Sequence, residues 1–252
     1  MARLSGRTAI VTGAAQGLGA VFAKALAAEG ANVAVCDVMD PAPTVAAIAA
    51  AGGNALGRIT DVTDPAAVAA LVMEVDGRWG GIQILVNNAS ISGETQPKPF
   101  LEISSQEFDR MMQVNVRGFF ECAKAVVPIM RRQNYGKIIN LASGNFFSAT
   151  PEFLHYVASK GAVIAMTRAM ARACGDWGIG VNSLAPGLTM SERVSAKFAK
   201  IPERTQGIVN AQSFKRLEQP QDLVGTLIFL ASADSDFITG QMLMVDGGAA
   251  MH

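Results

Sequence analysis

The sequence has few cysteines, no excess of either charge and no long hydrophobic run, and each shortage excludes a class of protein. The three cysteines, Cys36, Cys122 and Cys174, are odd in number and widely scattered, which fits neither a disulfide framework nor a zinc site. Lysine plus arginine and aspartate plus glutamate both total 21, so no basic surplus indicates a nucleic-acid partner. No apolar run approaches the roughly 18 residues that a membrane span needs.

These shortages predict a cytoplasmic protein that binds no metal, membrane or nucleic acid. Scattered cysteines are typical of buried thiols in a reducing compartment. A strand-like run begins near Thr8, which leaves no room for a signal peptide. Half of the 252 residues are hydrophobic and 17% are charged, which is the composition of a globular domain.

Short apolar runs alternate with longer helical patterns along the whole chain. The runs are mostly continuous, which is typical of strands buried on both faces of a parallel sheet. The segments between them are long enough for crossover helices. The sequence therefore predicts one α/β domain over 1–252, a doubly wound Rossmann-type parallel sheet of about seven strands with helices on both faces. The predicted strands are 8–12, 32–36, 55–59, 82–87, 136–142, 180–185 and 241–245.

The least regular stretch, about 187–215, follows the sixth predicted strand. Long irregular segments inside compact domains are usually binding segments or lids. We therefore expect a substrate lid there.

A glycine-rich turn, TGAAQGLG over 12–19, follows the first predicted strand and opens a helix. Its glycines, Gly13, Gly17 and Gly19, allow unusual dihedrals and a close approach to a pyrophosphate. The helix start offers free N–H groups and a positive dipole end to the phosphates. An acid, Asp37, follows Gly17 by about 20 residues, as a dinucleotide site requires for the ribose. This context favours a dinucleotide site over a plain turn.

The glycine spacing and six further motifs resemble the short-chain dehydrogenase/reductase family. The motifs fall in family order and cover nearly the whole chain. In closer detail the sequence is similar to NAD-dependent members that act on aromatic or cyclic alcohols and carbonyls. The six motifs are DV (61–62), NNAS (87–90), INLAS ending at Ser143, YVASK (156–160), VNSLAPG (181–187) and ITGQMLMVDGG (238–248).

The resemblance implies a nicotinamide dinucleotide cofactor and a set of residues that bind it. Asp61 and Val62 match the pair that contacts adenine, and the segment 185–191 matches the one whose backbone meets the nicotinamide carboxamide. Ser191 stands where the family often has threonine, and it keeps the hydroxyl. The cofactor residues expected besides the three glycines, Asp37, Asp61 and Val62 are Gln16, Leu18, Asn88, Ala89, Tyr156, Lys160, Pro186, Gly187, Thr189 and Ser191.

Tyr156 and Lys160 stand four residues apart, about one helical turn or roughly 6 Å along the axis. Such a pair is often mere packing, but alcohol oxidation requires a base to remove a hydroxyl proton. The resemblance implies that Tyr156 is this base and that Lys160 lowers its pKa, which is near 10 in free tyrosine. Ser143 would hold the substrate oxygen. Asn115 would hold a water that joins Lys160 to solvent. Alone, Ser143 would be read as a turn residue and Asn115 as a helix cap or kink.

His155 adjoins Tyr156, but adjacent residues on a helix point in different directions. We therefore interpret His155 as a structural or pocket-wall residue. Ser90 replaces the glycine usual in the family and places a polar group near the pocket.

Apolar residues flank the expected reaction centre and predict a mainly apolar pocket with one or two polar groups. The substrate expected is a secondary alcohol or ketone, or an alcohol or aldehyde, on an aromatic or alicyclic body. Two alternatives remain, a 3-oxoacyl-thioester reductase and an inactive NAD-sensing protein. The expected pocket residues are Ser90, Asn145, Phe147, Phe153, Leu188 and Met190, with Phe146 and Phe198 nearby.

Two further expectations concern the choice of dinucleotide and the assembly. The carboxylate of Asp37 predicts NAD, because it can accept hydrogen bonds from ribose hydroxyls and would repel a 2′-phosphate. No lysine or arginine lies in 38–43 to offset it, and Asp40 adds negative charge. The segments 115–130 and 157–174 are apolar around most of their circumference, which predicts subunit contacts in a homotetramer.

Overall fold

A computed structural model describes residues 2–91, 96–198 and 202–251. Its centre is one sheet of seven parallel strands in the order β3-β2-β1-β4-β5-β6-β7. The predicted sheet is thus confirmed, and five strands are buried along nearly their whole length, as their continuous apolar sequences indicated. The strands are β1 (Thr8–Thr12), β2 (Asn32–Asp37), β3 (Asn54–Ile59), β4 (Ile84–Asn87), β5 (Gly136–Leu141), β6 (Ile179–Pro186) and β7 (Met242–Val245).

Most strand bounds lie within two residues of the predicted ones, and β4 differs for a physical reason. It begins at Ile84 rather than Ile82. The Gln83 side chain accepts a hydrogen bond from the Thr8 N–H at 2.8 Å, and the Gln83 N–H donates to the Thr8 carbonyl at 3.0 Å. A side chain thus takes the place of one ladder bond, and regular pairing with β1 starts at Ala9 and Ile84.

The chain runs outward in both directions from the middle of the sheet. From β1 it passes to β2 and β3 on one side, and then returns to β4 on the other side of β1 and continues to β7. The neighbours β1 and β4 therefore form the point at which the winding reverses. In open parallel sheets, ligands bind beyond the carboxyl ends of the strands at such a point.

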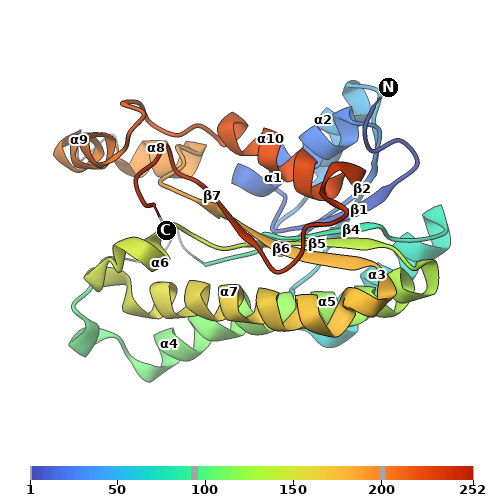
Figure 1. Cartoon of the computed structure of the whole chain (residues 1–252), viewed down its shortest axis with the longest axis horizontal. Helices are drawn as coiled ribbons and strands as arrows, with labels where there is room; N and C mark the ends of the chain where they lie inside the picture. Colours follow the sequence, from blue (N-terminus) through green and yellow to red (C-terminus); the bar gives the residue numbers. More distant parts are fainter. Residues whose placement is uncertain (1, 92–95, 199–201, 252) are drawn as a thin grey trace.

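Helices cover both faces of the sheet, as predicted (Figure 1). On one face, Phe22, Leu26 and Leu227 pack into the same core as Val11 and Val35 of the central strands. On the other face, Val75, Val126 and Met130 form a second core. The first face carries α1 (Gly17–Ala28), α2 (Ala42–Ala50) and α10 (Pro220–Ala231), and the second carries α3 (Pro65–Trp79), α5 (Gly118–Gln133) and α7 (Leu154–Cys174).

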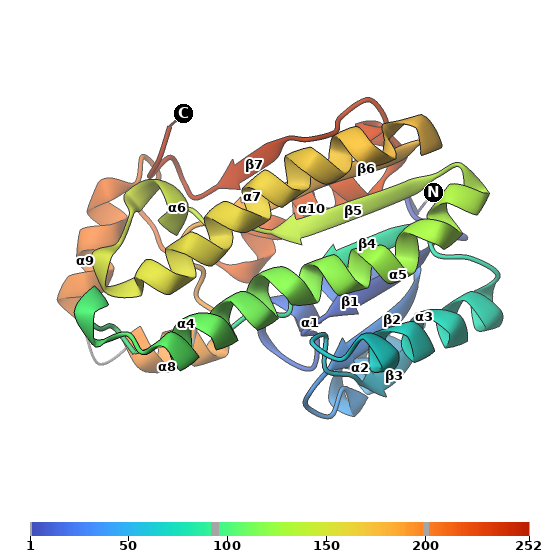
Figure 2. The same ribbon diagram turned by 90° about the horizontal axis from the view of Figure 1, so that it is seen from below.

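Shorter helices gather at the end of the sheet to which the strands point (Figures 1 and 2). Within 187–215 the structure has helices α8 and α9, so the expectation of an irregular stretch was wrong. Two glycines, one proline and scattered polar residues in this range made the two short helices difficult to recognise in the sequence. The remaining helices are α4 (Ser105–Met112), α6 (Asn145–Ser148), α8 (Glu192–Phe198), α9 (Pro202–Ala211), and the single turns η1 (Phe100–Glu102), η2 (Gln113–Arg117), η3 (Pro151–Phe153), η4 (Gly175–Trp177) and η5 (Ala233–Ser235).

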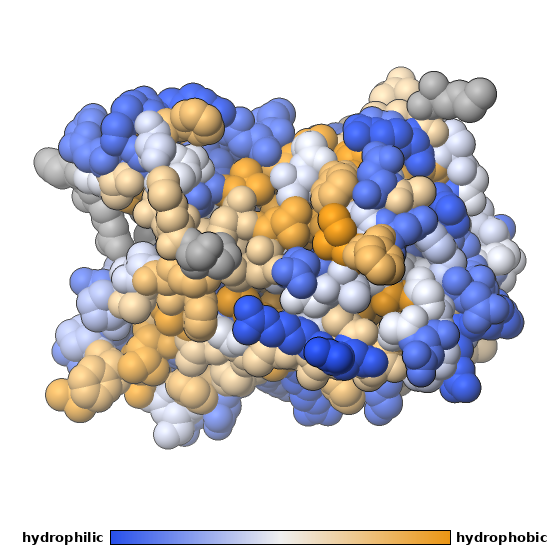
Figure 3. All heavy atoms as spheres, in the orientation of Figure 1, coloured by the Kyte–Doolittle hydropathy of each residue, from blue (hydrophilic) through white to orange (hydrophobic). Residues whose placement is uncertain are grey.

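In the orientation of Figure 1, the surface at one end of the molecule differs in hydropathy from the surface over its middle. Figure 3 shows hydrophilic side chains over α9 and hydrophobic ones over the middle, where α10 and β7 lie. Edge strand β7 contributes to the hydrophobic area, because its four residues are only partly buried. The three cysteines are free and buried, as expected. Among the described residues, no helix is long and apolar enough to cross a membrane.

Candidate active site

The residues singled out in the sequence come together beyond the carboxyl ends of β1, β4, β5 and β6. The glycine-rich turn follows β1, Asn88 to Ser90 follow β4, Ser143 follows β5, and Gly187 follows β6. Because the strands are parallel, all these segments meet at one edge of the sheet, next to the point where the winding reverses.

The glycine-rich turn has the backbone that a phosphate cradle requires. Gly13 and Gly17 have φ values of 63° and 60°, which favour glycine. A Cβ on Gly13 would lie 2.6 Å from Ala89 Cα, and one on Gly19 would lie 2.2 Å from the Gly13 carbonyl oxygen. At Gly13 and Gly19 the backbone is therefore packed too closely for a side chain, and α1 begins within the turn at Gly17. These features fit the pyrophosphate of a dinucleotide.

A threonine braces the glycine-rich turn against the end of β4. The Thr12 hydroxyl accepts hydrogen bonds from the backbone N–H groups of Asn88 and Ala89, both at 3.0 Å. The Asn88 side chain returns two bonds, to the carbonyls of Thr12 at 3.0 Å and Gly13 at 2.9 Å. Asn88 and Ala89 thus support the turn that is expected to hold the cofactor. The sequence showed Thr12 only as a residue before the glycines, and its bracing role could not be read from it.

Asp37 ends β2 with its carboxylate facing the glycine-rich turn. One carboxylate oxygen accepts the Ala15 N–H at 3.0 Å and the other accepts the Met39 N–H at 3.1 Å. Each oxygen has a further lone pair, so the carboxylate can still accept bonds from a ribose. Gln16, which precedes α1, reaches toward the same residue Met39, with its amide nitrogen 3.5 Å from the Met39 sulfur.

The expected adenine-contacting pair follows β3. Burial raises the pKa of Asp61, but hydrogen bonds from the Thr63 N–H and hydroxyl, both at 2.8 Å, outweigh it and the pKa is lowered. Val62 is buried, and a Cβ on Gly118 would lie 2.6 Å from its side chain. Leu18 packs against the core under α1. The side chains of Val62 and Leu18 are thus used in packing.

Ser143 and Tyr156 meet at the end of β5. The Ser143 side chain lies close enough to Tyr156 to affect its pKa, and its hydroxyl accepts the Asn145 N–H at 3.2 Å. Burial raises the pKa of Tyr156 above its usual value of 10.0, and the Ser143 side chain partly opposes this. The two hydroxyls are therefore placed side by side, as acid/base work on one substrate oxygen requires.

Lys160 lies one turn after Tyr156 on α7, as predicted. Its ammonium is buried, with 2% of the residue exposed, and donates to the Leu141 carbonyl at 2.7 Å. The nitrogen lies 5.6 Å from the centre of the Tyr156 ring. Burial lowers the pKa of Lys160 to about 7. In the protein alone, burial raises the pKa of Tyr156, and the Lys160 ammonium is directed at the Leu141 carbonyl. The expectation that Lys160 lowers the Tyr156 pKa together with the positive nicotinamide ring stays a prediction.

Asn115 connects three parts of the site from a wide helical turn. It is fully buried in η2, a turn of the wide type often found at functional positions. Its amide accepts from the Ile91 N–H at 2.8 Å and donates to the Ile91 carbonyl at 3.2 Å and the Ser159 hydroxyl at 3.1 Å. Ser159 in turn donates to the Tyr156 carbonyl at 2.7 Å. Asn115 therefore holds the segment after β4 against α7.

The segment after β6 is held by a residue that sequence reasoning missed. The side chain of Glu218 accepts hydrogen bonds from the Gly187 N–H at 3.0 Å and from the Thr189 hydroxyl. Pro186 and Thr189 are buried. Ser191 continues the loop, and its N–H donates to the Thr189 carbonyl at 2.9 Å. A single acid shortly before Pro220 belongs to no recognisable motif, so only the folded structure shows that Glu218 holds this segment.

The expected pocket residues lie around this centre on several segments. Ser90 follows β4, and its hydroxyl is buried with no hydrogen-bond partner among the described residues. Phe146 and Phe147 form an edge-to-face pair, with ring centres 5.1 Å apart. Phe146 also packs toward Gly161 of α7. Asn145 and Phe147 lie on α6, Phe153 ends η3, Leu188 and Met190 are partly buried in the loop after β6, and the side chain of Phe198 lies outside the described part of the structure.

His155 is buried near charged groups that lie outside the catalytic set, and its structural interpretation stays a prediction. Only 4% of it is exposed, and burial lowers its pKa, with Glu107 and Lys98 acting in opposite directions. Its Nδ1 has no hydrogen-bond partner among the described residues. These neighbours belong to α4 and the segment before it.

Comparison with known proteins gives matches over nearly the whole chain. A family model described as enoyl-(acyl carrier protein) reductase, adh_short_C2, matches residues 13–250. Galactitol 2-dehydrogenase from Agrobacterium fabrum is 40% identical, over 98% of each chain. The 3-oxoacyl-(acyl-carrier-protein) reductase FabG from Staphylococcus aureus is 36% identical, over 97% of this chain and 98% of the relative.

Solved structures agree with this comparison. A protein described as a short-chain alcohol dehydrogenase from Sinorhizobium meliloti has a TM-score of 0.92 and 34% identity, over 98% of this chain and 97% of that chain. Levodione reductase has a TM-score of 0.91 and 30% identity, over 99% and 100%. A protein described as an NAD(P)-dependent gluconate 5-dehydrogenase from Beutenbergia cavernae, with NADP bound at low occupancy, has a TM-score of 0.90 and 33% identity, over 98% and 97%.

Proposed function

The chain belongs to the short-chain dehydrogenase/reductase family of oxidoreductases, and from that premise we propose that it interconverts a secondary alcohol and a ketone with NAD. The single observation that carries the proposal is the placement of Ser143, Tyr156 and Lys160 beside the glycine-rich turn. A nicotinamide cofactor, when bound, accepts or supplies the hydride. The protein must therefore bind the cofactor, orient the alcohol and move one proton.

Each member of the catalytic set has a defined task in this reaction. Tyr156 removes the proton from the alcohol, or returns it to the ketone oxygen in the reverse direction. Ser143 donates to the same oxygen and stabilises its developing charge. Lys160, whose pKa is about 7, can take up or release a proton at neutral pH one turn from the phenol. Asn115 keeps the segment after β4 in place beside them.

The pocket favours a substrate with an apolar ring. Phe147 and Phe153 flank the catalytic serine and tyrosine in the chain, while Leu188 and Met190 lie on the loop after β6. Ser90 adds one buried hydroxyl that has no hydrogen-bond partner within the described part of the chain, and this hydroxyl can fix a polar group of the substrate. Levodione reductase, whose structure is similar, is by its name a reductase, which supports a reaction between a carbonyl and an alcohol. The substrate proposed is an alcohol or ketone on an aromatic or alicyclic body.

A substrate panel tests this proposal. With NAD or NADH, we expect kcat/KM for aromatic or alicyclic secondary alcohols and ketones to exceed that for open-chain polyols by at least about tenfold, or about 1.4 kcal/mol. Formation or loss of reduced cofactor is followed by absorbance. A strong preference for open-chain sugars would contradict the proposal, and galactitol is the polyol to include because of the relative that bears its name.

One alternative function has an observation in its favour. The FabG relative is 36% identical over nearly the full length, which supports a 3-oxoacyl-thioester reductase. A 3-oxoacyl thioester therefore belongs in the same panel. If it is the best substrate, the alternative is correct and the proposed ring-bearing substrate is wrong. A panel in which no compound turns over, with NAD still bound, would instead favour a cofactor sensor.

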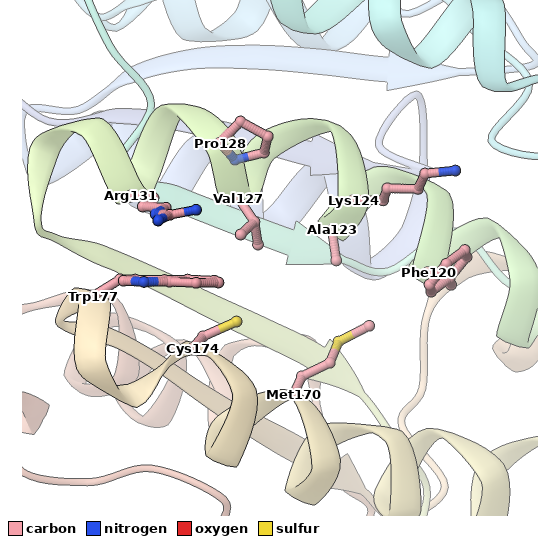
Figure 4. A pocket seen from close by; sticks show the side chains of 9 residues that line it. All are labelled: Phe120, Ala123, Lys124, Val127, Pro128, Arg131, Met170, Cys174 and Trp177. Atoms are coloured by element: carbon pink, nitrogen blue, oxygen red, sulfur yellow. The ribbon is translucent and has the colours of Figure 1, made fainter.

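We further propose that the chain forms a homotetramer through α5 and α7. An apolar groove runs between these helices, and Figure 4 shows side chains of both pointing into it. Phe120 is 44% exposed at one end, and Trp177 stacks under the Arg131 guanidinium at 4.6 Å at the other. Exposed apolar surface of this kind on helices is typical of a subunit interface.

A charge placed in the groove is expected to disrupt the tetramer. In Val127→Asp, the new carboxylate would lose its hydration when the subunits associate. We therefore expect the dissociation constant of the tetramer to rise by at least about tenfold. The matched control is Met73→Asp, because Met73 lies on α3 outside the groove and is 74% exposed. Sedimentation velocity at micromolar concentration measures both. Only monomer in the unaltered protein would contradict the proposal.

A further inference from the structure

The carboxylate of Glu218 is buried behind the loop after β6, which we define as residues 187–191. Only 4% of Glu218 is exposed. One of its oxygens accepts the Gly187 N–H at 3.0 Å, and the other accepts the Thr189 hydroxyl at 2.5 Å. Its backbone carbonyl accepts the Met190 N–H at 2.8 Å. One residue therefore holds three successive parts of the loop.

The loop passes so close to Glu218 that position 187 has no room for a side chain. A Cβ built on Gly187 would lie 2.8 Å from Glu218 Oε2 and 3.0 Å from Asp246 Cβ. The Gly187 N–H also donates to the Val245 carbonyl at 3.1 Å, so it is shared between β7 and the carboxylate. Displacement of the Glu218 side chain would open space behind Gly187 and remove the partner of Thr189.

The surroundings of Glu218 oppose its negative charge. Burial is the largest cause that raises its pKa to about 7, and the carboxylates of Asp222 and Asp246 raise it further. The Thr189 hydroxyl and the Gly187 N–H act in the other direction. The charge of Glu218 contributes to the raised pKa of Arg216. The Arg216 guanidinium, however, donates its hydrogen bonds to Asp222, at 2.6 and 2.7 Å. Burial of a carboxylate lowers the stability of the folded protein unless hydrogen bonds compensate for the lost hydration.

We propose that Glu218 is a positioning residue that holds the 187–191 loop in the conformation that receives the nicotinamide half of the cofactor. The inference rests on the proposed function, in which this loop binds the cofactor. Glu218 acts through Gly187 and Thr189 and has no direct role in proton transfer. Because the Thr189 hydroxyl is bound to Glu218, the loop offers the cofactor its backbone groups rather than this side chain.

The bonds of Glu218 depend on its ionisation. The carboxylate accepts from both loop groups, whereas on protonation one oxygen becomes a donor and a bond must be rearranged. With a raised pKa, this change falls near pH 7 rather than near 4.5. The holding interaction is complete above the pKa and weakens as the pH falls through it. Affinity for the nicotinamide half should therefore rise with pH across this range.

Comparison of two ligands separates this role from a general loss of structure. The ligands are NADH and ADP-ribose, which lacks nicotinamide, and binding is measured by calorimetric titration at about pH 6 and about pH 8.5. We expect Glu218→Ala to weaken NADH at the higher pH by about tenfold or more and ADP-ribose by less than about twofold. Thr189→Val, which removes one bond and keeps the shape, should show a smaller change of the same kind.

The conservative variant and a surface control complete the design. Glu218→Gln keeps an oxygen for the Gly187 N–H and cannot ionise, so NADH affinity should stay within about threefold and lose its pH dependence. Asp234→Asn, at an exposed acid on η5, should change neither affinity nor pH dependence. If Glu218→Ala does not fold, Glu218→Gln and Thr189→Val alone decide the matter through the pH dependence and the ligand comparison.

Two results would overturn the inference, and they differ from a failure of the proposed function. Equal weakening of NADH and ADP-ribose would show that Glu218 only maintains the fold. Unchanged NADH affinity and an unchanged pH dependence in Glu218→Gln would show that the carboxylate does not hold the loop. If the unaltered protein binds neither ligand, the proposed function itself is wrong and the inference fails with it.

Discussion

Replacement of Tyr156 by phenylalanine is expected to lower kcat by about a thousandfold or more, or about 4 kcal/mol, and to leave NAD affinity nearly unchanged. The phenol hydroxyl is the group that takes the proton, and it lies beside Ser143 at the end of β5. The ring itself remains and keeps its place on α7, so the packing of the site survives. Steady-state kinetics with the best substrate measures kcat, and calorimetric titration measures NAD affinity.

The second tyrosine supplies the control for this experiment. Tyr135 is the only other tyrosine in the sequence, and it directly precedes β5, at the end of the strand opposite to Ser143. Tyr135→Phe should therefore keep kcat within about twofold. If Tyr156→Phe retains more than about a tenth of kcat, it loses less than about 1.4 kcal/mol of transition-state stabilisation, and Tyr156 is not the acid/base.

The unaltered protein is expected to prefer NAD to NADP by about a hundredfold in kcat/KM, or about 2.7 kcal/mol. Asp37 ends β2 beside the glycine-rich turn, held by the N–H groups of Ala15 and Met39. Its remaining acceptor positions suit ribose hydroxyls, whereas a 2′-phosphate would meet like charge. Asp37→Ala should shrink the ratio, mainly because NAD is bound less tightly. Measurement of kcat/KM with both cofactors tests each statement.

A neighbouring acid provides the matched control for Asp37. Asp40 is exposed and accepts the Ala42 N–H at 2.9 Å at the start of α2, so Asp40→Ala should change the ratio far less than Asp37→Ala. A similar solved structure holds NADP at low occupancy, so the fold alone does not decide between the two dinucleotides. Equal efficiency with NADP in the unaltered enzyme would therefore show that Asp37 does not read the ribose.

The fold was predictable because its signals are local. Continuous apolar runs such as 33–36 and 84–86 can be recognised without knowing their neighbours, since strands buried on both faces need no alternation. The glycines of the turn were predictable for a similar reason, because backbone with positive φ at Gly13 and Gly17 strongly favours one residue type. Motif order then predicted Ser143 and Tyr156 at the same edge of the sheet, and the structure brings the two side chains close together there.

The parts that could not be predicted depend on contacts distant in sequence. Glu218 is hydrogen-bonded to Gly187 and Thr189, which lie about 30 residues away in the sequence. No rule of sequence spacing predicts these contacts. The lowered pKa of Lys160 comes from its burial, and its ammonium donates to the Leu141 carbonyl; only the packed structure shows either feature. The two helices within 187–215 are short, and short helices draw most of their stability from packing rather than from their own sequence.

Transfer of deuterium from substrate to cofactor tests the central claim most directly. The best alcohol from the panel is prepared with deuterium on its carbinol carbon and incubated with NAD and the enzyme, and the reduced cofactor is analysed by mass spectrometry. The account predicts that the deuterium appears on the nicotinamide ring, because the hydride passes directly between the two bound molecules. It also predicts that Tyr156→Phe, which lacks the base, forms almost none of this product. Deuterium found in the solvent, or labelled product formed equally by Tyr156→Phe, would contradict the account.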